Sequence, residues 1–194
     1  MLLLCVSSYL VGGVPFAYLA VRLLRGTDIR RHGSGNVGAT NAARLFHERW
    51  RLVAFLCLFA LDAGKGATAV LLLPRLIGAA EQGPVLAGLF AVVGHMFPPY
   101  LRFRGGKGVA TTLGALAALE PVATLIALGA FAAVYGTTRV VGAGSLALAV
   151  ALPVAVFARG VAPPGVGPLT LVLSGLIVVR HRSNIARMVR RQGP

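Results

Sequence analysis

Long apolar stretches alternate with short polar, mostly basic ones along the whole 194-residue chain. A helix that spans a membrane needs about 20 mostly apolar residues, with a range of about 17–25. The pattern therefore predicts an all-α integral membrane protein with seven transmembrane helices. The seven apolar segments are Leu2–Leu23, Leu52–Ile77, Val85–Pro98, Val109–Leu119, Pro121–Tyr135, Val140–Ala158 and Val166–Val179.

Four of these segments, the third, fourth, fifth and seventh, are short for a full crossing. We therefore expect some helices to be short or broken near the cytoplasmic face. Only Glu120 and Pro121 mark the boundary between the fourth and fifth segments, which predicts a helical hairpin there. The chain contains no internal repeat and no low-complexity linker, so residues 1–194 are predicted to form a single transmembrane domain.

Composition supports the membrane interpretation. Hydrophobic residues make up 57% of the chain and charged residues only 12%, whereas soluble domains average about 45–50% and about 25%. Most of the surface is therefore expected to face lipid. The two cysteines, Cys5 and Cys57, lie in apolar runs, and their number and spacing exclude a disulfide framework or a zinc site.

The charges are strongly one-sided, with 19 Lys and Arg against 5 Asp and Glu. Nucleic acid binding is disfavoured because aromatic residues are few and the basic residues lie between apolar segments. Basic residues concentrate in cytoplasmic loops of membrane proteins, and here the predicted outer side receives only Arg75 and Arg159. This bias predicts an outside N-terminus, a cytoplasmic C-terminus and an odd number of spans. Residues 1–21 carry no charged side chain, and Arg22 and Arg25 follow them, whereas a signal peptide has its basic residues first. The first segment is therefore predicted to be a retained helix.

The first informative loop is "HGSGNVGATNAARLF", residues 32–46. Glycines let backbone N–H groups converge on an anion, and an arginine can hold a phosphate with two parallel hydrogen bonds. The loop predicts either an anion site or a polar interfacial loop with helix caps. Its candidate residues are Ser34, Asn36, Thr40, Asn41 and Arg44.

The second loop is "RFRGGKGVAT", residues 102–111, in which Gly105, Gly106 and Gly108 surround Lys107 ahead of an apolar helix. A glycine turn that leads into a helix N-terminus is suited to bind an anion. It is not a Walker A motif, because that motif needs an earlier glycine and a Ser or Thr after the lysine. The alternative is a membrane turn with a snorkelling lysine.

The third loop is the tail "RHRSNIARMVRR", where His181 and Asn184 stand at helical spacing and could share a face. A basic amphipathic helix on the membrane surface is the alternative.

Three polar residues stand within or at the end of apolar segments. Asp62 and Lys65 are three residues apart, which predicts a structural ion pair because charges inside a membrane are costly unless paired. His95, in "GHMFPPY", is a weak metal-ligand signal by itself. No Ser-His-Asp signature accompanies these residues, since Ser34 does not stand in a Gly-x-Ser-x-Gly context.

Taken together, "SGNVGATNAAR", "GHMFPPYLRFRGGKGVAT" and "HRSNIARM" resemble the motifs of the bacterial acyl-phosphate glycerol-3-phosphate acyltransferases, the PlsY family. The segments "GGVPFAYL", "LDAGKGA" and "TRVVGAGSLA" extend the likeness over most of the chain. This chain departs from the family at Gly13 and Gly142, where the family commonly has Ser.

The resemblance implies a seven-helix enzyme of the bacterial inner membrane with its active site at the cytoplasmic face. Such enzymes transfer a fatty acyl group from acyl phosphate to the 1-hydroxyl of glycerol 3-phosphate, the first acylation step of phospholipid synthesis. They use no cofactor, metal or acyl-CoA. The implied partners are these two substrates, membrane lipids and, functionally, the enzyme that produces acyl phosphate.

On this resemblance we expect three catalytic residues, with Lys107 neutralising the leaving phosphate; the base is either His181 or that phosphate. The expected catalytic residues are Ser34, Lys107 and His181, and the expected substrate-binding residues are Asn36, Thr40, Asn41, Arg44, His95, Gly105, Gly106, Gly108 and Asn184. Two other classes stay open, a transporter of phosphorylated solutes and a non-catalytic membrane subunit that binds anionic lipid.

Overall fold

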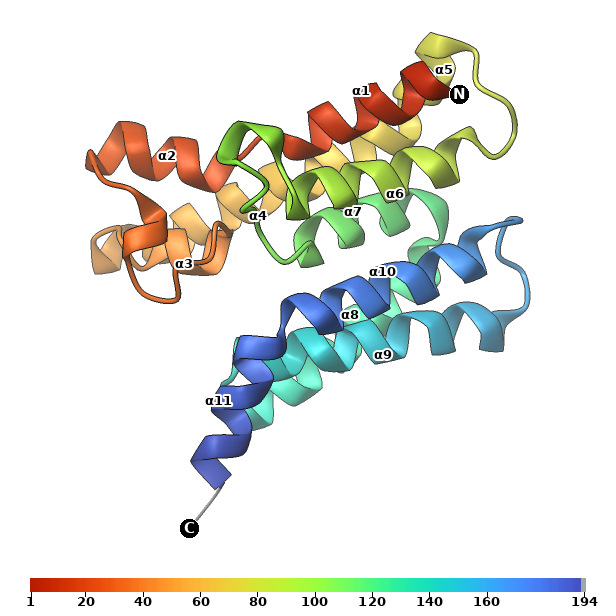
Figure 1. Ribbon diagram of the computed structural model, residues 1–194. Coiled ribbons are helices and arrows are strands. Elements are labelled where there is room, and N and C mark those ends of the chain that lie inside the picture. Colours follow the sequence, from red (N-terminus) through yellow and green to blue (C-terminus); the bar gives the residue numbers. More distant parts are fainter. Residues whose placement is uncertain (193–194) are drawn as a thin grey trace. The chain divides into compact units, whose positions relative to one another are not determined.

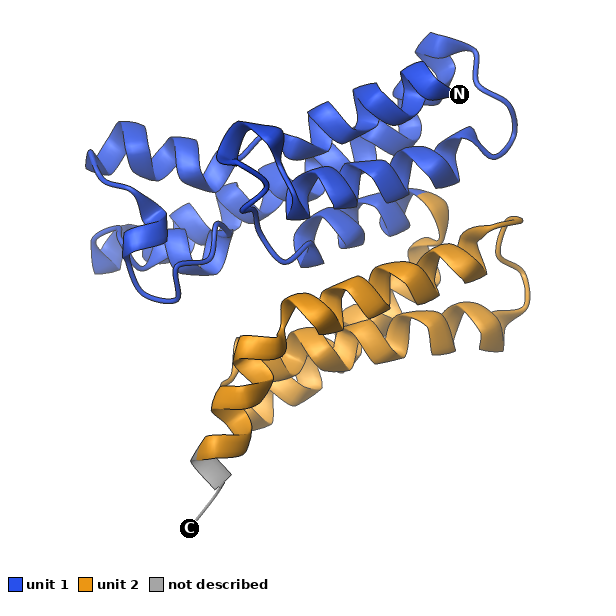
Figure 2. Cartoon of the chain, in the orientation of Figure 1, with its two compact units in different colours: residues 1–118 blue, residues 119–194 orange. Residues whose placement is uncertain are grey.

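The computed structural model describes residues 1–192, and its regular structure is entirely helical within that range (Figure 1). The chain divides into two compact units, residues 1–118 and 119–194 (Figure 2). The expectation of one domain over residues 1–194 stays a prediction.

The first unit contains seven α-helices and two short 3-10 turns within the described residues. These are α1 (Leu2–Gly13), α2 (Phe16–Arg25), η1 (Ile29–Arg31), α3 (Ala39–Ala43), α4 (Glu48–Leu71), α5 (Leu73–Ile77), α6 (Gly83–Met96), η2 (Pro99–Leu101) and α7 (Val109–Leu119). Helices α1, α4 and α6 pack on one another.

The second unit contains α8 (Pro121–Thr138), α9 (Val141–Arg159), α10 (Val166–Arg180) and α11 (Arg182–Gln192). Helix α9 packs against both α8 and α10. Glu120 caps α8 by accepting the N–H of Ala123, and its Oε2 lies 3.3 Å from Nε of Arg159 at the end of α9. That contact brings the start of α8 to the end of α9, as an antiparallel pair requires.

The predicted all-α membrane class is confirmed. Five stretches among the described residues are long and apolar enough to cross a membrane: Leu2–Arg25, Glu48–Ile77, Gly83–Leu101, Pro121–Thr138 and Val141–Arg159. Two further apolar helices, α7 and α10, are shorter. The count of seven crossings and the orientation stay predictions.

The first predicted segment is broken, which the apolar pattern did not reveal. Helix α1 ends at Gly13, and α2 begins at Phe16. Pro15 has no N–H to continue the helix and disfavours helical geometry at the residue before it. Val14 accordingly takes φ −55° and ψ 116°, outside the helical region. The break releases backbone carbonyls at the end of α1.

Helices α4 and α7 meet at backbone distance. A side chain at Gly114 would overlap the backbone of Ala63, so only glycine allows this approach. A Cβ at Gly66 of α4 would likewise overlap the carbonyl of Thr111, so the first turn of α7, which follows the glycine turn, also lies against α4.

A buried apolar cluster ties the first loop to the rest of the first unit. Its members come from α2, the residue 29–42 region, α4 and η2: Ala17, Val21, Ile29, Val37, Ala39, Ala42, Leu58 and Leu101. Because Leu101 directly precedes the second predicted loop and Val37 belongs to the first, one core supports both loops.

Candidate functional site

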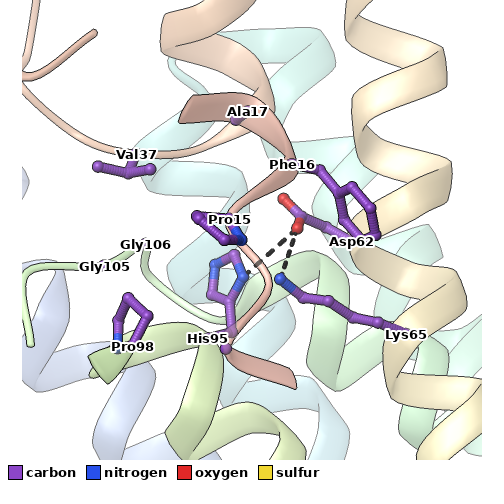
Figure 3. A pocket seen from close by; sticks show the side chains of 11 residues that line it. Pro15, Phe16, Ala17, Val37, Asp62, Lys65, His95, Pro98, Gly105 and Gly106 are labelled. Atoms are coloured by element: carbon purple, nitrogen blue, oxygen red, sulfur yellow. Dashed lines mark ion pairs between the residues drawn. The ribbon is translucent and has the colours of Figure 1, made fainter. Parts of the chain in front are cut away.

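A small cavity lies in the first unit, where segments far apart in the sequence meet (Figure 3). Its volume is about 10 Å³, close to the space that one water molecule needs. The lining comes from the α1–α2 break, the first loop, α4, α6 and the glycine turn: Gly13, Pro15, Phe16, Ala17, Val37, Asp62, Lys65, His95, Pro98, Gly105 and Gly106.

The cavity wall carries a buried network of charged and polar side chains. Lys65 Nζ lies 2.8 Å from Asp62 Oδ1, and the two side chains are only 3% and 4% exposed. Nδ1 of His95 lies 3.5 Å from the same Asp62 oxygen (Figure 3). The predicted ion pair between Asp62 and Lys65 is confirmed. Because both side chains are buried, removing either one would leave the other as a costly unpaired charge.

Lys65 also reaches the break between α1 and α2. Its ammonium donates a hydrogen bond of 2.8 Å to the carbonyl of Val14 and lies 5.7 Å from the centre of the Phe16 ring. Carbonyls at a helix C-terminus lack intrahelical partners and attract cations. The break at Pro15 therefore supplies the acceptor that this buried lysine needs.

The second loop folds back onto the end of α6. The N–H of Gly105 donates to the carbonyl of Met96 at 3.2 Å, and the N–H of Gly106 donates to the carbonyl of His95 at 3.1 Å. These bonds differ from the expectation that both glycines offer their N–H groups to a phosphate, because backbone carbonyls already occupy them. Lys107, which follows directly, is half-buried.

The candidate anion groups of this loop are therefore Lys107 and the N-terminus of α7. Gly108, with φ +85°, accepts the N–H of Thr112 and so opens the helix. The N–H groups in the first turn of a helix have no intrahelical partners and favour negative charge.

In the first loop, Asn41 has a structural role that sequence reasoning missed. Its buried side-chain amide nitrogen donates to the carbonyls of Ile29, His32 and Asn36 at 3.4, 3.0 and 3.1 Å. Its oxygen accepts the N–H of Ser34 at 3.1 Å. The hydrogen-bonding groups of Asn41 are thus used to shape the loop.

The other candidates of this loop are more accessible. Ser34 and Arg44 are exposed, while Asn36 and Thr40 are half-buried. Arg44 stands at the end of α3, where its backbone N–H donates to the carbonyl of Ala42. The structure thus brings the first and second loops together, through the shared core and the cavity.

The third loop belongs to the second unit. His181 follows α10 and donates from Nδ1 to the carbonyl of Ile177 at 2.8 Å. A carbonyl only accepts, so this nitrogen carries hydrogen and the neutral ring has its lone pair on Nε2. The backbone carbonyl of His181 accepts the N–H of Asn184 at 2.8 Å and opens α11. The expected meeting of His181 and Asn184 with the first two loops stays a prediction.

Asn184 packs closely on the position where this chain departs from the expected serine. A Cβ added to Gly142, at the start of α9, would lie 2.6 Å from Nδ2 of Asn184. The missing side chain at Gly142 therefore makes room for the Asn184 amide within the second unit.

Asp28 is a further residue that the sequence analysis did not single out. It caps η1 by accepting the N–H of Arg30 at 2.9 Å, and its carboxylate lies 2.6 Å from Nη2 of Arg30. An Asp placed two residues before an Arg just after a helix was the available signal. The hydrogen bond from the Arg30 side chain lowers the pKa of Asp28 from 3.8 to about 2.

This pKa predicts an acid-dependent contribution to stability. A carboxyl whose pKa is lower in the folded state stabilises the fold above its unfolded pKa, and that stabilisation disappears as the pH falls through the folded value. We expect Asp28→Asn to lower the Tm above about pH 5, with the difference shrinking between pH 3.8 and about 2. Thermal unfolding of the wild type and Asp28→Asn in detergent, at a series of pH values, measures this Tm difference.

The matched control is Glu48→Gln, because Glu48 is 87% exposed and lies 3.9 Å from Arg51. Exposed pairs contribute little, so its Tm should follow wild type throughout. A Tm difference for Asp28→Asn that stays constant down to pH 2 would contradict the assignment.

Comparison with known proteins supplies the family. A family model described as glycerol-3-phosphate acyltransferase matches residues 2–191. A relative of that name from Myxococcus xanthus (strain DK1622) is 44% identical over 190 residues, covering 97% of this chain and 95% of the relative. Another from Anaeromyxobacter sp. (strain Fw109-5) is 42% identical over 195 residues, covering 97% and 93%.

Solved structures agree. The crystal structure of PlsY (YgiH), an integral membrane glycerol 3-phosphate acyltransferase, matches in its glycerol 3-phosphate form with a TM-score of 0.86 and 33% identity. The match covers 100% of this chain and 94% of that one. The lysophosphatidic acid form matches with a TM-score of 0.84 and 32% identity, covering 100% and 93%. This chain therefore belongs to the glycerol-3-phosphate acyltransferase family.

Proposed function

We propose that this protein transfers a fatty acyl group from acyl phosphate to the 1-hydroxyl of glycerol 3-phosphate. The hydroxyl oxygen forms a bond to the acyl carbon, and the bond from that carbon to the phosphate oxygen breaks. The products are lysophosphatidic acid and inorganic phosphate. The proton lost by the hydroxyl goes to the released phosphate or to solvent.

The observation that carries the proposal is the full-length likeness to the solved PlsY structures, at 33% and 32% identity, whose two forms hold glycerol 3-phosphate and lysophosphatidic acid. Those molecules are the acceptor and the product of the proposed reaction. Acyl phosphate as the donor comes from the family resemblance of the three loops.

The first unit supplies groups that suit two phosphate-bearing substrates. Arg44 is exposed at the end of α3, where a guanidinium can hold a phosphate through two parallel hydrogen bonds. Lys107 and the start of α7, in the same unit, supply further positive charge for a second phosphate. An acyl phosphate is already activated, so positioning and charge stabilisation are sufficient and no enzyme nucleophile is needed.

The proposal includes a location in the bacterial inner membrane, with seven spans and the active site facing the cytoplasm. The uneven distribution of arginine and lysine among the loops supports it. After Cys5 and Cys57 are replaced by alanine, a membrane-impermeant thiol reagent applied to spheroplasts should label Gln82→Cys and leave Ser183→Cys unlabelled. Labelling of Ser183→Cys alone would reverse the orientation.

A reconstituted assay tests the reaction itself. Purified protein in detergent is supplied with synthetic palmitoyl phosphate and labelled glycerol 3-phosphate, and phosphate release and labelled lysophosphatidic acid are measured. We expect one phosphate per lysophosphatidic acid, only when both substrates are present, and no product from palmitoyl-CoA. Absence of acyl transfer, or exchange of glycerol 3-phosphate across proteoliposomes without a donor, would contradict the proposal.

A further inference from the structure

The buried network around Asp62 connects three parts of the first unit that meet at the cavity. Lys65 joins α4 to the carbonyl of Val14 at the α1–α2 break, and Asp62 joins α4 to His95 near the end of α6. Both links join α4 to a place where another helix ends or breaks, and both of these places line the cavity. The network therefore acts between elements as well as within one helix.

His95 continues the connection to the glycine turn in two ways. Its backbone carbonyl accepts the N–H of Gly106 at 3.1 Å. Its ring lies so close to Gly106 that a Cβ there would overlap Nε2 of the imidazole. The position of the His95 ring thus decides where the Gly105–Gly106 turn can lie, and the next residue on that turn is Lys107.

We propose that Asp62, Lys65 and His95 are positioning residues that hold the Gly105–Gly106 turn in the geometry that brings the Lys107 ammonium to the phosphate of the substrate. The inference rests on the proposed function, since it assigns Lys107 to the transfer step. It differs from a purely structural ion pair because the network acts through one catalytic group.

The chemistry of the network favours this role over simple stabilisation. A buried ion pair is seldom more stabilising than apolar side chains of the same volume, because both charges lose their hydration. What the pair supplies is direction, because Asp62 Oδ1 lies 2.8 Å from Lys65 Nζ and 3.5 Å from Nδ1 of His95. A ring packed beside a fixed carboxylate keeps one orientation. A misplacement of about 1 Å at a reacting group can cost about 10²-fold in rate.

A double-mutant cycle with Lys107 separates positioning from the alternatives. The double variant Asp62→Asn/Lys65→Met removes both buried charges at once and so leaves neither ion unpaired. We expect kcat to fall by about tenfold to 10²-fold in the wild-type background, with the KM for glycerol 3-phosphate within about twofold. In the Lys107→Ala background the same change should alter the residual rate by less than about twofold, because the group that it positions is gone.

Equal losses in the two backgrounds would overturn the proposal, because a structural defect or a direct substrate contact by His95 costs the same with or without Lys107. Full kcat in the double variant would overturn it as well. The matched control neutralises the ion pair of the other unit, Glu120→Gln/Arg159→Met, and is expected to keep wild-type kcat.

Two further measurements keep these outcomes distinct. Thermal unfolding in detergent reports whether the double variant folds; if it does not, the same cycle with His95→Asn decides the question by the same criterion. That variant keeps an N–H near Asp62 and removes the ring beside Gly106. Failure of the wild-type protein to make lysophosphatidic acid would refute the proposed function instead, whereas an active wild type with additive losses refutes only the positioning.

Discussion

Replacing Lys107 by alanine is expected to lower kcat/KM by about 10²–10³-fold, because removing one group that stabilises developing charge typically costs that much. The lysine follows the Gly105–Gly106 turn and precedes α7, so we expect its ammonium and the helix N-terminus to act on the same charge. Phosphate release under saturating and limiting palmitoyl phosphate measures the effect, and the loss should appear mainly in kcat.

The control for this substitution is Arg51→Ala, which also removes one positive charge from the predicted cytoplasmic side. Arg51 is 52% exposed and lies 3.9 Å from Glu48, an arrangement that contributes little. Its kinetics should match wild type. If Lys107→Ala retained more than about a tenth of wild-type kcat/KM, Lys107 would not be the group that neutralises the leaving phosphate.

Changing Arg44 to lysine is expected to raise the KM for glycerol 3-phosphate by about 10–100-fold with a smaller change in kcat. Lysine keeps the charge but lacks the planar fork that forms two parallel hydrogen bonds to a phosphate. A hydrogen bond to a charged group contributes about 1.5–3 kcal/mol, which corresponds to that range. Initial rates at varied glycerol 3-phosphate and saturating donor measure it.

Arg31→Lys is the matched control, because Arg31 is exposed directly before the same loop and has no predicted role. It should leave the KM unchanged. An unaltered KM in Arg44→Lys as well would exclude a two-bond contact between Arg44 and the acceptor phosphate.

The apolar pattern predicted the helices well because it records which parts of the chain face lipid. The segment predicted as Val109–Leu119 has the bounds of α7, and the segment predicted as Val166–Val179 ends one residue before α10 does. The apolar pattern did not predict the break after Gly13, because Val14, Pro15 and Phe16 are all apolar and the mean hydropathy does not fall there. A proline inside an apolar run was the signal that deserved more weight.

Roles within the loops were harder to predict than the loops themselves. The sequence places Asn41 among several polar residues. Only the fold reveals that its side-chain amide donates to three carbonyls and accepts one N–H. The same holds for Gly105 and Gly106, whose N–H groups meet carbonyls near the end of α6. Hydrogen bonds between residues distant in sequence leave no periodic pattern in the chain.

The spacing of Asp62 and Lys65 has a consequence for how the protein is made. The two ions are one turn apart on α4 and neutralise each other within that helix, so the segment can leave the translocon for lipid without net charge at its centre, where an isolated ion is costly. The contacts to Val14 and His95 form only when α1 and α6 dock on it. Membrane insertion of α4 thus needs no neighbouring helix, whereas completion of the cavity wall is a later event of assembly.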